Sequence, residues 1–288
     1  MGDHYIPQFY LRGFTEAPEV DLVWVYRKGG EEPFKTSIRN IAQENQFYSP
    51  ETEKYLANEI EWPASKIIQK IRGQRPITHE DKVTLSKYMV VMWKRVPRCK
   101  RWVTDKAPEI MAPVFDRFDN ELAELGKQNP SKIDLVERRR KELRELRESK
   151  EDKFVSDMWL ESIPPDKTPQ SVNILSQMTW GFLTAGSGQY FITSDNPLFF
   201  FPEIGIGRKE SEVSFPIAKN IALLATWRID IGEGFFPARD RVVKEINQRT
   251  ASISTKFLYG PYQEAWIQAL ANKGKFNLNR IDFKGHAT

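Results

Sequence analysis

The hydrophobic pattern of this chain changes its period about two thirds of the way along, and this change limits the folds that it can adopt. Between residues 50 and 163, apolar side chains recur every three or four positions, which is the period of an amphipathic helix. After Gly186–Gly188 the apolar runs become short and are separated by turns that contain glycine or proline. We therefore predict an α+β fold with a mostly helical middle, a small N-terminal β-hairpin and a C-terminal antiparallel sheet.

Local signals set the expected elements. Residues 22–26 form a β-rich run that a glycine turn closes, and residues 34–38 are its expected hairpin partner. Thr78, with acidic residues directly behind it, is a good N-cap for a helix that Pro97 ends or kinks. The other expected helices cover residues 55–71, 107–127, 133–163, 172–183, 239–257 and 262–271, and the expected strands of the second sheet cover residues 189–193, 198–201, 213–217 and 221–226.

A charged helical stretch stands out from this pattern. Between Asp134 and Lys153 the chain holds eight basic and seven acidic residues and few large apolar ones. Opposite charges four positions apart can pair on a solvent-facing helix. We predict a single domain over residues 1–288 with a helical arm inserted in it at residues 107–163. The alternatives for the arm are an acidic or basic ligand site and a contact with a protein partner or a second copy of the chain.

Composition limits the location and the partners of the protein. The formal net charge is only +4, so a phosphate partner would need a local cluster of bases. Cys99 is the single cysteine, which excludes an intrachain disulfide and a zinc site built from several cysteines. Residues 1–20 show no secretory leader, and no stretch approaches the ~20 apolar residues of a membrane span. We therefore expect a cytoplasmic protein without membrane contact.

The first fourteen residues are dense in aromatic side chains. Phe9, Tyr10, Leu11 and Phe14 offer enough apolar surface to fasten this segment into a core, at roughly 1.5 to 3 kcal/mol for each side chain. His4 would then be held in place, where its imidazole can act as acid, base or metal ligand near neutral pH. The alternative is a histidine that only packs against the aromatic rings.

Four separated segments together resemble a known family. The segments are His4–Leu11, Glu51–Glu61, Arg95–Arg98 and Thr193–Pro197, in this order. They resemble the bacterial family catalogued as domain of unknown function 4238, over residues 4 to about 260 apart from the charged arm. The resemblance implies candidate positions for a site and implies no mechanism.

Two pairs of these residues carry groups suited to a site. Glu53 and Glu61 are eight positions apart, slightly over two helical turns, so both carboxylates can point the same way. Asp195 and Asn196 follow an expected strand and stand in a turn at the rim of the sheet. The alternative for the first pair is a solvated helix face, and the alternative for the second pair is ordinary turn chemistry.

A cluster of bases precedes the arm. The stretch Lys87–Arg101 contains six basic residues and no acidic one. Arg95 and Arg98 are three positions apart, and two guanidinium groups suit a phosphate or a carboxylate because each offers paired donors. The alternative is that they form internal salt bridges with Glu53 and Glu61.

We expect these residues to converge on one polar site. The expected catalytic residues are His4, Glu61 and Asp195, and the expected substrate-binding residues are Glu53, Arg95, Arg98 and Asn196. The preferred hypothesis is an enzyme acting on a phosphate-bearing ligand, nucleic acid or nucleotide, in which the arginines hold the phosphate and His4 or a carboxylate moves a proton. The alternative is a non-catalytic binding or regulatory protein whose polar cluster is structural. We predict no metal site and name no cofactor, although Asp195 and a glutamate leave an oxygen-rich magnesium site open.

Overall fold

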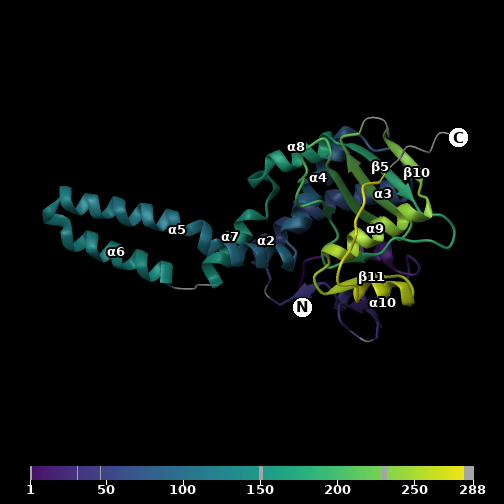
Figure 1. Cartoon of the computed structure of the whole chain (residues 1–288), viewed down its shortest axis with the longest axis horizontal. Coiled ribbons are helices and arrows are strands. Elements are labelled where there is room, and N and C mark those ends of the chain that lie inside the picture. Colours follow the sequence, from purple (N-terminus) through teal and green to yellow (C-terminus); the bar gives the residue numbers. More distant parts are fainter. Residues whose placement is uncertain (1, 31, 46, 149–151, 229–231, 282–288) are drawn as a thin grey trace. The chain divides into compact units, whose positions relative to one another are not determined.

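The computed structural model divides the chain into two compact units (Figure 1). The first unit combines Met1–Pro97 with Ile163–Thr288, and the second is the helical unit Arg98–Ser162. Antiparallel sheets and a helical middle are both present, which confirms the predicted α+β fold class. The structure describes residues 2–30, 32–45, 47–148, 152–228 and 232–281.

A four-stranded sheet joins the beginning of the chain to its end. β2 (Leu22–Arg27) and β3 (Phe34–Ser37) form the predicted N-terminal hairpin. β11 (Phe257–Gly260) pairs with the other edge of β2, and β6 (Thr193–Ser194) pairs with β11. All three pairings are antiparallel, in the order β3-β2-β11-β6.

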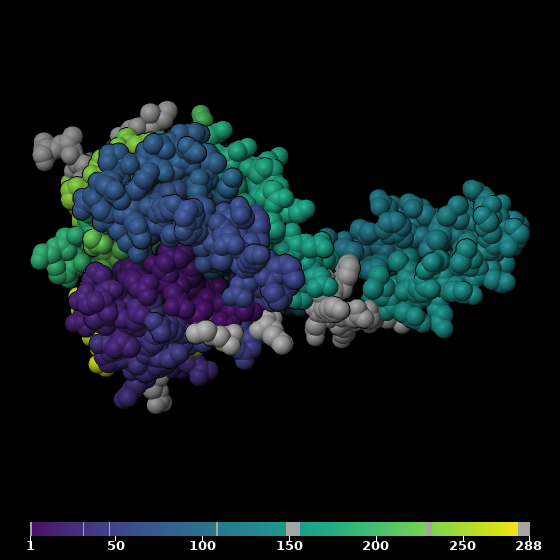
Figure 2. All heavy atoms as spheres, turned by 180° about the vertical axis from the view of Figure 1, so that it is seen from behind, coloured from purple at the N-terminus to yellow at the C-terminus, as the bar shows by residue number. Residues whose placement is uncertain are grey.

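The N-terminal segment is buried in the first unit. β1 (Asp3–His4) pairs with β4 (Gln43–Glu44), and α1 (Gln8–Leu11) follows it before a 3₁₀ turn. The side chain of Arg72 donates to the carbonyl oxygens of Phe9 and Tyr10 at 3.1 and 2.9 Å, which ties α1 to the helical middle. Figure 2 shows the N-terminal residues in purple next to the following segment in blue. The side chains of Ile6, Tyr10, Leu11 and Phe14 are fully buried.

The helical middle of the first unit begins where the change of period predicts it. α2 (Pro50–Tyr55) runs into a π-helical turn, Leu56–Glu61, and then into α3 (Trp62–Arg72). α4 (His79–Lys94) starts with a capping box between Thr78 and Asp81, as the acidic residues behind Thr78 indicate. The single helix expected over residues 55–71 is therefore helical throughout but contains one wider turn.

A five-stranded sheet forms the second layer, in the order β10-β5-β9-β8-β7. Its strands are β5 (Thr179–Thr184), β7 (Phe199–Phe200), β8 (Glu212–Ala218), β9 (Ile221–Thr226) and β10 (Gly234–Pro237). The pairs are antiparallel except that β10 runs parallel to β5.

Two predictions for this sheet are wrong. The helix expected over residues 172–183 ends early, since α8 (Pro169–Gln177) stops and β5 begins at Thr179. The run Trp180–Leu183 is buried throughout, and a short run without alternation does not distinguish strand from helix. The strand expected at 189–193 is reduced to β6, which belongs to the four-stranded sheet, and the amide of Ile192 bonds to the side chain of Asn247.

α9 (Asp240–Ile253) packs between the two sheets. Val242, Val243 and Ile246 join a core cluster with residues of β5 and β9. Ala251, near the other end of α9, joins a second cluster with residues of β2, β11 and α10 (Ala265–Ala271). The helix ends at Ile253 and not at the expected residue 257, because Phe257 starts β11.

The helical unit consists of long charged helices. α5 (Pro97–Gln128), a 3₁₀ turn, α6 (Ile133–Glu148) and α7 (Asp152–Ser162) follow one another. Ion pairs between Arg140 and Asp119 and between Arg147 and Asp116 connect α6 to α5. The expected arm at 107–163 falls in this unit apart from its last residue, and residues 149–151 of its charged stretch lie outside the described residues. No helix in the described ranges is both long and apolar enough to cross a membrane.

Candidate functional site

Arg95 is the centre of a polar cluster that contacts the backbone of the N-terminal segment. It follows the last residue of α4, and its side chain is fully buried. Its Nε donates to the carbonyl oxygen of Tyr5 at 2.7 Å, and its Nη2 donates to that of His4 at 3.3 Å. Its Nη1 forms an ion pair with Glu61 Oε1 at 2.7 Å. Arg95 therefore fastens the start of the chain to the helices and orients Glu61.

The π-helical turn places Glu61 at the wall of a pocket. Such turns are rare, and they occur frequently at functional sites. Here the turn contributes Leu56, Ala57 and Glu61 to the lining of a pocket of about 250 Å³. The other lining residues come from the N-terminal segment, from the loop before α2 and from α2 itself: His4, Pro7, Gln8, Phe9, Tyr48 and Glu53.

His4 lines this pocket with a partly buried imidazole. Burial lowers the pKa of the ring, because a buried imidazolium loses its hydration, and the charge of Arg95 adds to this effect. Hydrogen bonding to the backbone at Arg39 and Ile38 and the charge of Glu61 act in the opposite direction. In the described part of the chain, the buried Nε2 has no hydrogen-bond partner. The neutral form of the ring is thus favoured.

Glu53 lies beside a second carboxylate. Partial burial raises the pKa of the Glu53 carboxyl, and the charge of Asp3 and a hydrogen bond shared with it raise this pKa further. The charge of Glu61 acts in the same direction. Asp3 itself is held in place by the backbone amides of Phe47 and Tyr48, which donate to its Oδ2 at 2.7 and 3.1 Å. The environment of the Glu53 carboxyl therefore favours its protonated form.

The charges around the pocket are mainly negative. Three carboxyl groups, those of Asp3, Glu53 and Glu61, stand against the single guanidinium of Arg95. Each nitrogen of that guanidinium already donates to an oxygen of the protein, and no part of the side chain reaches solvent. The geometry favours the internal salt bridge with Glu61 over the phosphate contact expected for Arg95.

The structure does not bring all of the predicted residues together. His4, Glu53 and Glu61 line one pocket, and Arg95 binds Glu61 behind it. Arg98 is exposed and is the first residue of the helical unit, whereas Arg95 is buried in the first unit.

Asp195 and Asn196 belong to a different set of contacts. The carboxylate of Asp195 accepts the backbone amides of Thr255 and Lys256 at 2.7 and 2.6 Å, and that of Phe257 at 3.2 Å. Burial raises the pKa of Asp195, and these hydrogen bonds partly offset the shift. Asn196 donates from Nδ2 to the carbonyl oxygen of Ile253 at 3.1 Å. Both side chains therefore hold the connection between α9 and β11. The expectation that they lie beside His4 in one site is corrected accordingly.

Tyr5, the neighbour of His4 in the sequence, is the residue of this segment on which the charge of Asp195 acts. The charge of Asp195 contributes to a raised pKa of the Tyr5 phenol, after the larger effect of burial. The charges that act on His4 are those of Glu61 and Arg95. His4 therefore lines the pocket, while its neighbour Tyr5, in the bend after β1, lies near Asp195.

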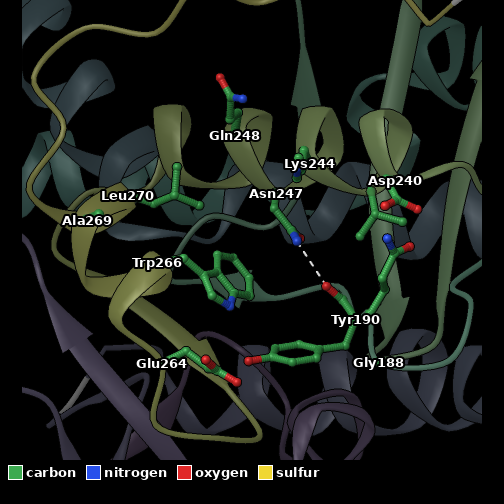
Figure 3. A pocket seen from close by; sticks show the side chains of 12 residues that line it. Gly188, Tyr190, Asp240, Lys244, Asn247, Gln248, Glu264, Trp266, Ala269 and Leu270 are labelled. Carbon is green, nitrogen blue, oxygen red and sulfur yellow. Dashed lines mark hydrogen bonds between the residues drawn. The ribbon is translucent and has the colours of Figure 1, made fainter.

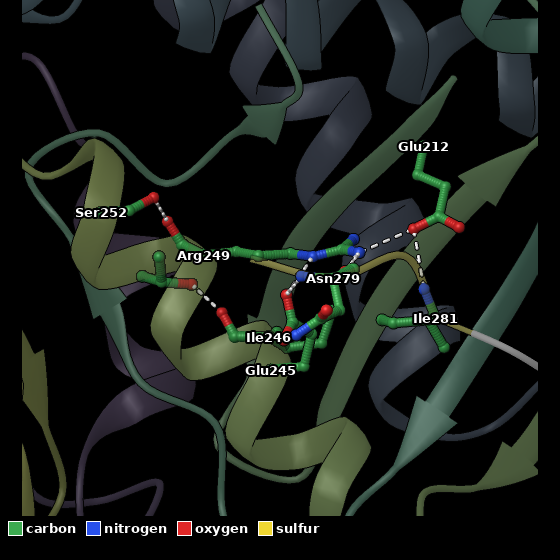
Figure 4. A network of polar contacts seen from close by, with 8 residues as sticks. Glu212, Glu245, Ile246, Arg249, Ser252, Asn279 and Ile281 are labelled. Atoms are coloured by element: carbon green, nitrogen blue, oxygen red, sulfur yellow. Dashed lines mark hydrogen bonds and ion pairs between the residues drawn. The ribbon is translucent and has the colours of Figure 1, made fainter. Parts of the chain in front are cut away.

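Sequence reasoning missed a second buried arginine. Arg249 in α9 is fully buried, and it forms ion pairs with Glu212 in β8 at 2.7 Å and with Glu245 at 3.2 Å (Figure 4). It also donates to the carbonyl oxygen of Asn279. The i,i+4 spacing of Glu245 and Arg249 is the only signal in the sequence for this network. The network joins α9, the five-stranded sheet and the segment that leads to Ile281.

The described residues hold no group of three or more histidine, cysteine, aspartate and glutamate side chains that is arranged for a metal ion. A family model described as protein of unknown function (DUF4238) matches residues 3–263. That range contains every residue that lines the pocket of His4, Glu53 and Glu61, which we call the His4 pocket. No curated protein and no solved structure is similar enough to the chain to count as a match.

Proposed function

The chain belongs to the DUF4238 family of proteins of unknown function, and from the geometry of its N-terminal pocket we propose that it is an enzyme that uses His4 and Glu53 for general acid–base catalysis on a small neutral or cationic ligand. One observation carries this proposal. His4, whose buried Nε2 has no hydrogen-bond partner among the described residues, lines a pocket whose other charged groups are carboxylates.

The two titratable groups suit proton transfer near neutral pH. The lowered pKa of His4 favours a neutral ring, which can accept a proton through Nε2. The raised pKa of Glu53 brings this carboxyl closer to the range in which it can donate one. Paired groups whose environments move their pKa values in this way are typical of acid–base sites. Glu61, which Arg95 orients, would position the ligand.

The charge of the pocket indicates the class of ligand. A phosphate would meet the carboxyl groups of Asp3, Glu53 and Glu61 without access to Arg95, so its binding is disfavoured. The volume of about 250 Å³ is just under the roughly 300 to 1,000 Å³ of pockets for larger ligands. We therefore retain the hypothesis of an enzyme, and we propose a small neutral or cationic ligand in place of the phosphate-bearing ligand expected from the sequence.

The second candidate is a non-catalytic binding or regulatory protein. It is favoured by the complete burial of Arg95 and by its three bonds to Tyr5, His4 and Glu61, since such a cluster can serve only to fix the N-terminal segment. In that case His4 and Glu53 would bind no ligand.

Side-chain NMR of the full chain separates these candidates. Small polyols, amides and alkylamines are added to protein with labelled histidine, with inorganic phosphate and a nucleotide as anionic probes. We expect a neutral or cationic probe to shift the His4 resonances and leave those of the exposed His79 unchanged. Glu53→Gln should abolish turnover of any chromogenic ester, amide or glycoside that the wild type hydrolyses, without lowering the melting temperature. A His4 signal that responds only to phosphate or nucleotide, or to no probe, would overturn the proposal.

A further inference from the structure

We propose a second binding site, for an organic cation, in the pocket between α9 and α10 (Figure 3). This pocket of about 540 Å³ shares no residue with the His4 pocket. Its walls are formed by α9, by α10 and by the loop before β6. The inference stands on these residues alone and does not depend on the proposed acid–base activity.

Aromatic rings form one corner of the pocket. The rings of Tyr190 and Trp266 lie with their centroids 5.5 Å apart at an angle of 51°. Tyr262 packs on the far side of Tyr190 at 5.4 Å. Trp266 is 37% exposed even though it stands in a pocket, so part of its indole surface is open to a ligand. Cations bind to the faces of such rings, and to tryptophan most strongly.

Polar atoms meet at the base of this corner. Figure 3 shows the Tyr190 hydroxyl, the Trp266 indole nitrogen and the Glu264 carboxylate turned toward one another. The buried Tyr190 hydroxyl has no hydrogen bond of ordinary geometry among the described residues, but Glu264 and Trp266 lie close enough to act on its pKa through hydrogen bonding. Burial and the charge of Glu264 raise the pKa of this phenol, so the hydroxyl stays protonated and can donate. Glu264 supplies the negative charge that a bound cation needs.

Among the residues that line the pocket, carboxylates outnumber ammonium groups, and the ammonium of Lys219 lies beside its aromatic corner. Two carboxylates, Asp240 and Glu264, line it against the single ammonium of Lys244. The same aromatic cluster already attracts one cation of the protein, since the ammonium of Lys219 lies 5.6 Å from the centre of the Tyr262 ring. The pocket offers a comparable aromatic surface together with a carboxylate.

The walls of the corner are held by the fold before any ligand arrives. Asn247 donates to the carbonyl oxygen of Tyr190 at 2.9 Å and accepts the amide of Ile192 at 3.0 Å. The Tyr26 hydroxyl donates to the carbonyl oxygen of Tyr262 and accepts the amide of Glu264, both at 2.7 Å. Groups fixed in this way lose little conformational entropy on binding. Rigid walls of this kind are typical of a binding site.

The ligand class follows from these features. A quaternary or alkylated ammonium group fits the aromatic corner and Glu264, because such a cation carries apolar substituents and is weakly hydrated. The rest of the pocket is partly apolar, through Val243, Ala269 and Leu270. An ammonium compound with an apolar extension therefore matches the pocket better than a bare metal ion or ammonium ion.

The test compares choline with its neutral isostere, 3,3-dimethyl-1-butanol, which has the same shape without the charge. Both are titrated into the full chain by calorimetry and by NMR. We expect saturable binding of choline, and binding of the isostere weaker by about tenfold, which corresponds to the loss of one cation–π contact and one ionic contact. Equal binding of the two compounds, or no saturable binding of choline, would overturn the inference.

Variants of the corner make the test specific. Glu264→Gln keeps the shape and removes the charge, and Trp266→Leu keeps an apolar side chain and removes the ring. Each should weaken choline binding severalfold, with little effect on the isostere in the case of Glu264→Gln. Trp62→Leu is the matched control, since Trp62 is 61% exposed in α3 and lines neither pocket. Unchanged choline binding in both Glu264→Gln and Trp266→Leu would place the cation elsewhere and overturn the assignment.

Discussion

Arg95 and Arg249 are both fully buried and both bind carboxylates, yet their surroundings differ. Arg249 lies between Glu212 and Glu245 (Figure 4). Each of these carboxylates also accepts a backbone amide, from Ile281 at 3.1 Å and from Asn279 at 2.9 Å. Both carboxylates are almost completely buried, so this network is closed to ligands.

The cluster around Arg95 is open on one side. Its carboxylate partner, Glu61, keeps 24% of its side-chain surface exposed at the pocket wall. His4 and Glu53 line the same pocket with groups whose pKa values are displaced from their ordinary range. A buried ion pair is therefore not by itself a mark of a functional site. What distinguishes the Arg95 cluster is the set of titratable groups that face a cavity.

Replacement of Arg249 should give the largest effect. Arg249→Met leaves Glu212 and Glu245 buried without a counter-charge, and loss of one partner from a buried ion pair costs about 3 to 5 kcal/mol. Urea denaturation of wild type and variant measures the loss. Arg249→Lys is the matched control and should lie between them, since a lysine keeps the charge without the fork that spans two carboxylates. If Arg249→Met lowered the free energy of unfolding by less than about 1 kcal/mol, the network would not be closed to water as described.

Replacement of Arg95 should cost less. Arg95→Met leaves a single carboxylate, which is partly exposed and can be hydrated, together with two unpaired carbonyl oxygens. We expect a loss of about 1.5 to 3 kcal/mol, the range for hydrogen bonds to charged groups. The same urea titration makes the comparison direct. If Arg95→Met destabilised the chain more than Arg249→Met, the distinction between an open and a closed cluster would fail.

The sequence predicted the helices and strands better than it predicted which strands pair with one another. The helical period after Pro50 and the hairpin glycines located α2 to α4 and β2–β3, because these signals are local. The strand β5 was missed, since Trp180–Leu183 is buried on both faces and lacks alternation. The parallel pairing of β10 with β5 was also missed, because such a pairing depends on contacts between distant segments.

The same limit applies to the candidate site. Glu53 and Glu61, eight positions apart, both line the pocket, although a π-helical turn replaces the regular spacing between them. Asp195 was expected there because a buried carboxylate needs partners, but three backbone amides near the start of β11 supply them. Neither the loop that brings Thr255–Phe257 to Asp195 nor the π turn that aims Glu61 has a signature in one sequence.

The pH dependence of stability should report on the open cluster. The folded pKa of His4 lies below the ordinary value of 6.5 because burial disfavours the charged ring. Between these two values the unfolded chain binds a proton that the folded chain does not, so stability falls as the pH drops through this window. His4→Gln should remove this part of the acid sensitivity. Melting temperatures between about pH 7.5 and pH 5 test it. The exposed His79, replaced as His79→Gln, serves as control, and an acid slope equal to that of wild type in His4→Gln would contradict the placement of the ring.

The smallest expected effect separates two glutamates in α2. The folded pKa of Glu53 is raised by partial burial and by Asp3, so its favourable contribution is present below the ordinary glutamate pKa and is lost as the pH rises through the folded value. Glu53→Gln should therefore stabilise the chain at neutral pH, by less than about 1 kcal/mol because the side chain is largely exposed and its charge is screened.

Glu51 gives the matched control with the opposite sign. The pKa of its carboxyl is lowered by a hydrogen bond to its own backbone amide and by one from Ser49, so Glu51→Gln should slightly lower the melting temperature at neutral pH. Both differences should vanish in acid, where all of these carboxyls are protonated. Glu53 would then lower the stability of the chain at neutral pH, while Glu51 in the same helix raises it. A residue that lowers stability is often one that is retained for function. Glu53→Gln could instead destabilise the chain as Glu51→Gln does. The carboxyl groups of Glu53 and Asp3 would then have a structural role, and the Arg95 cluster would resemble the closed network of Arg249.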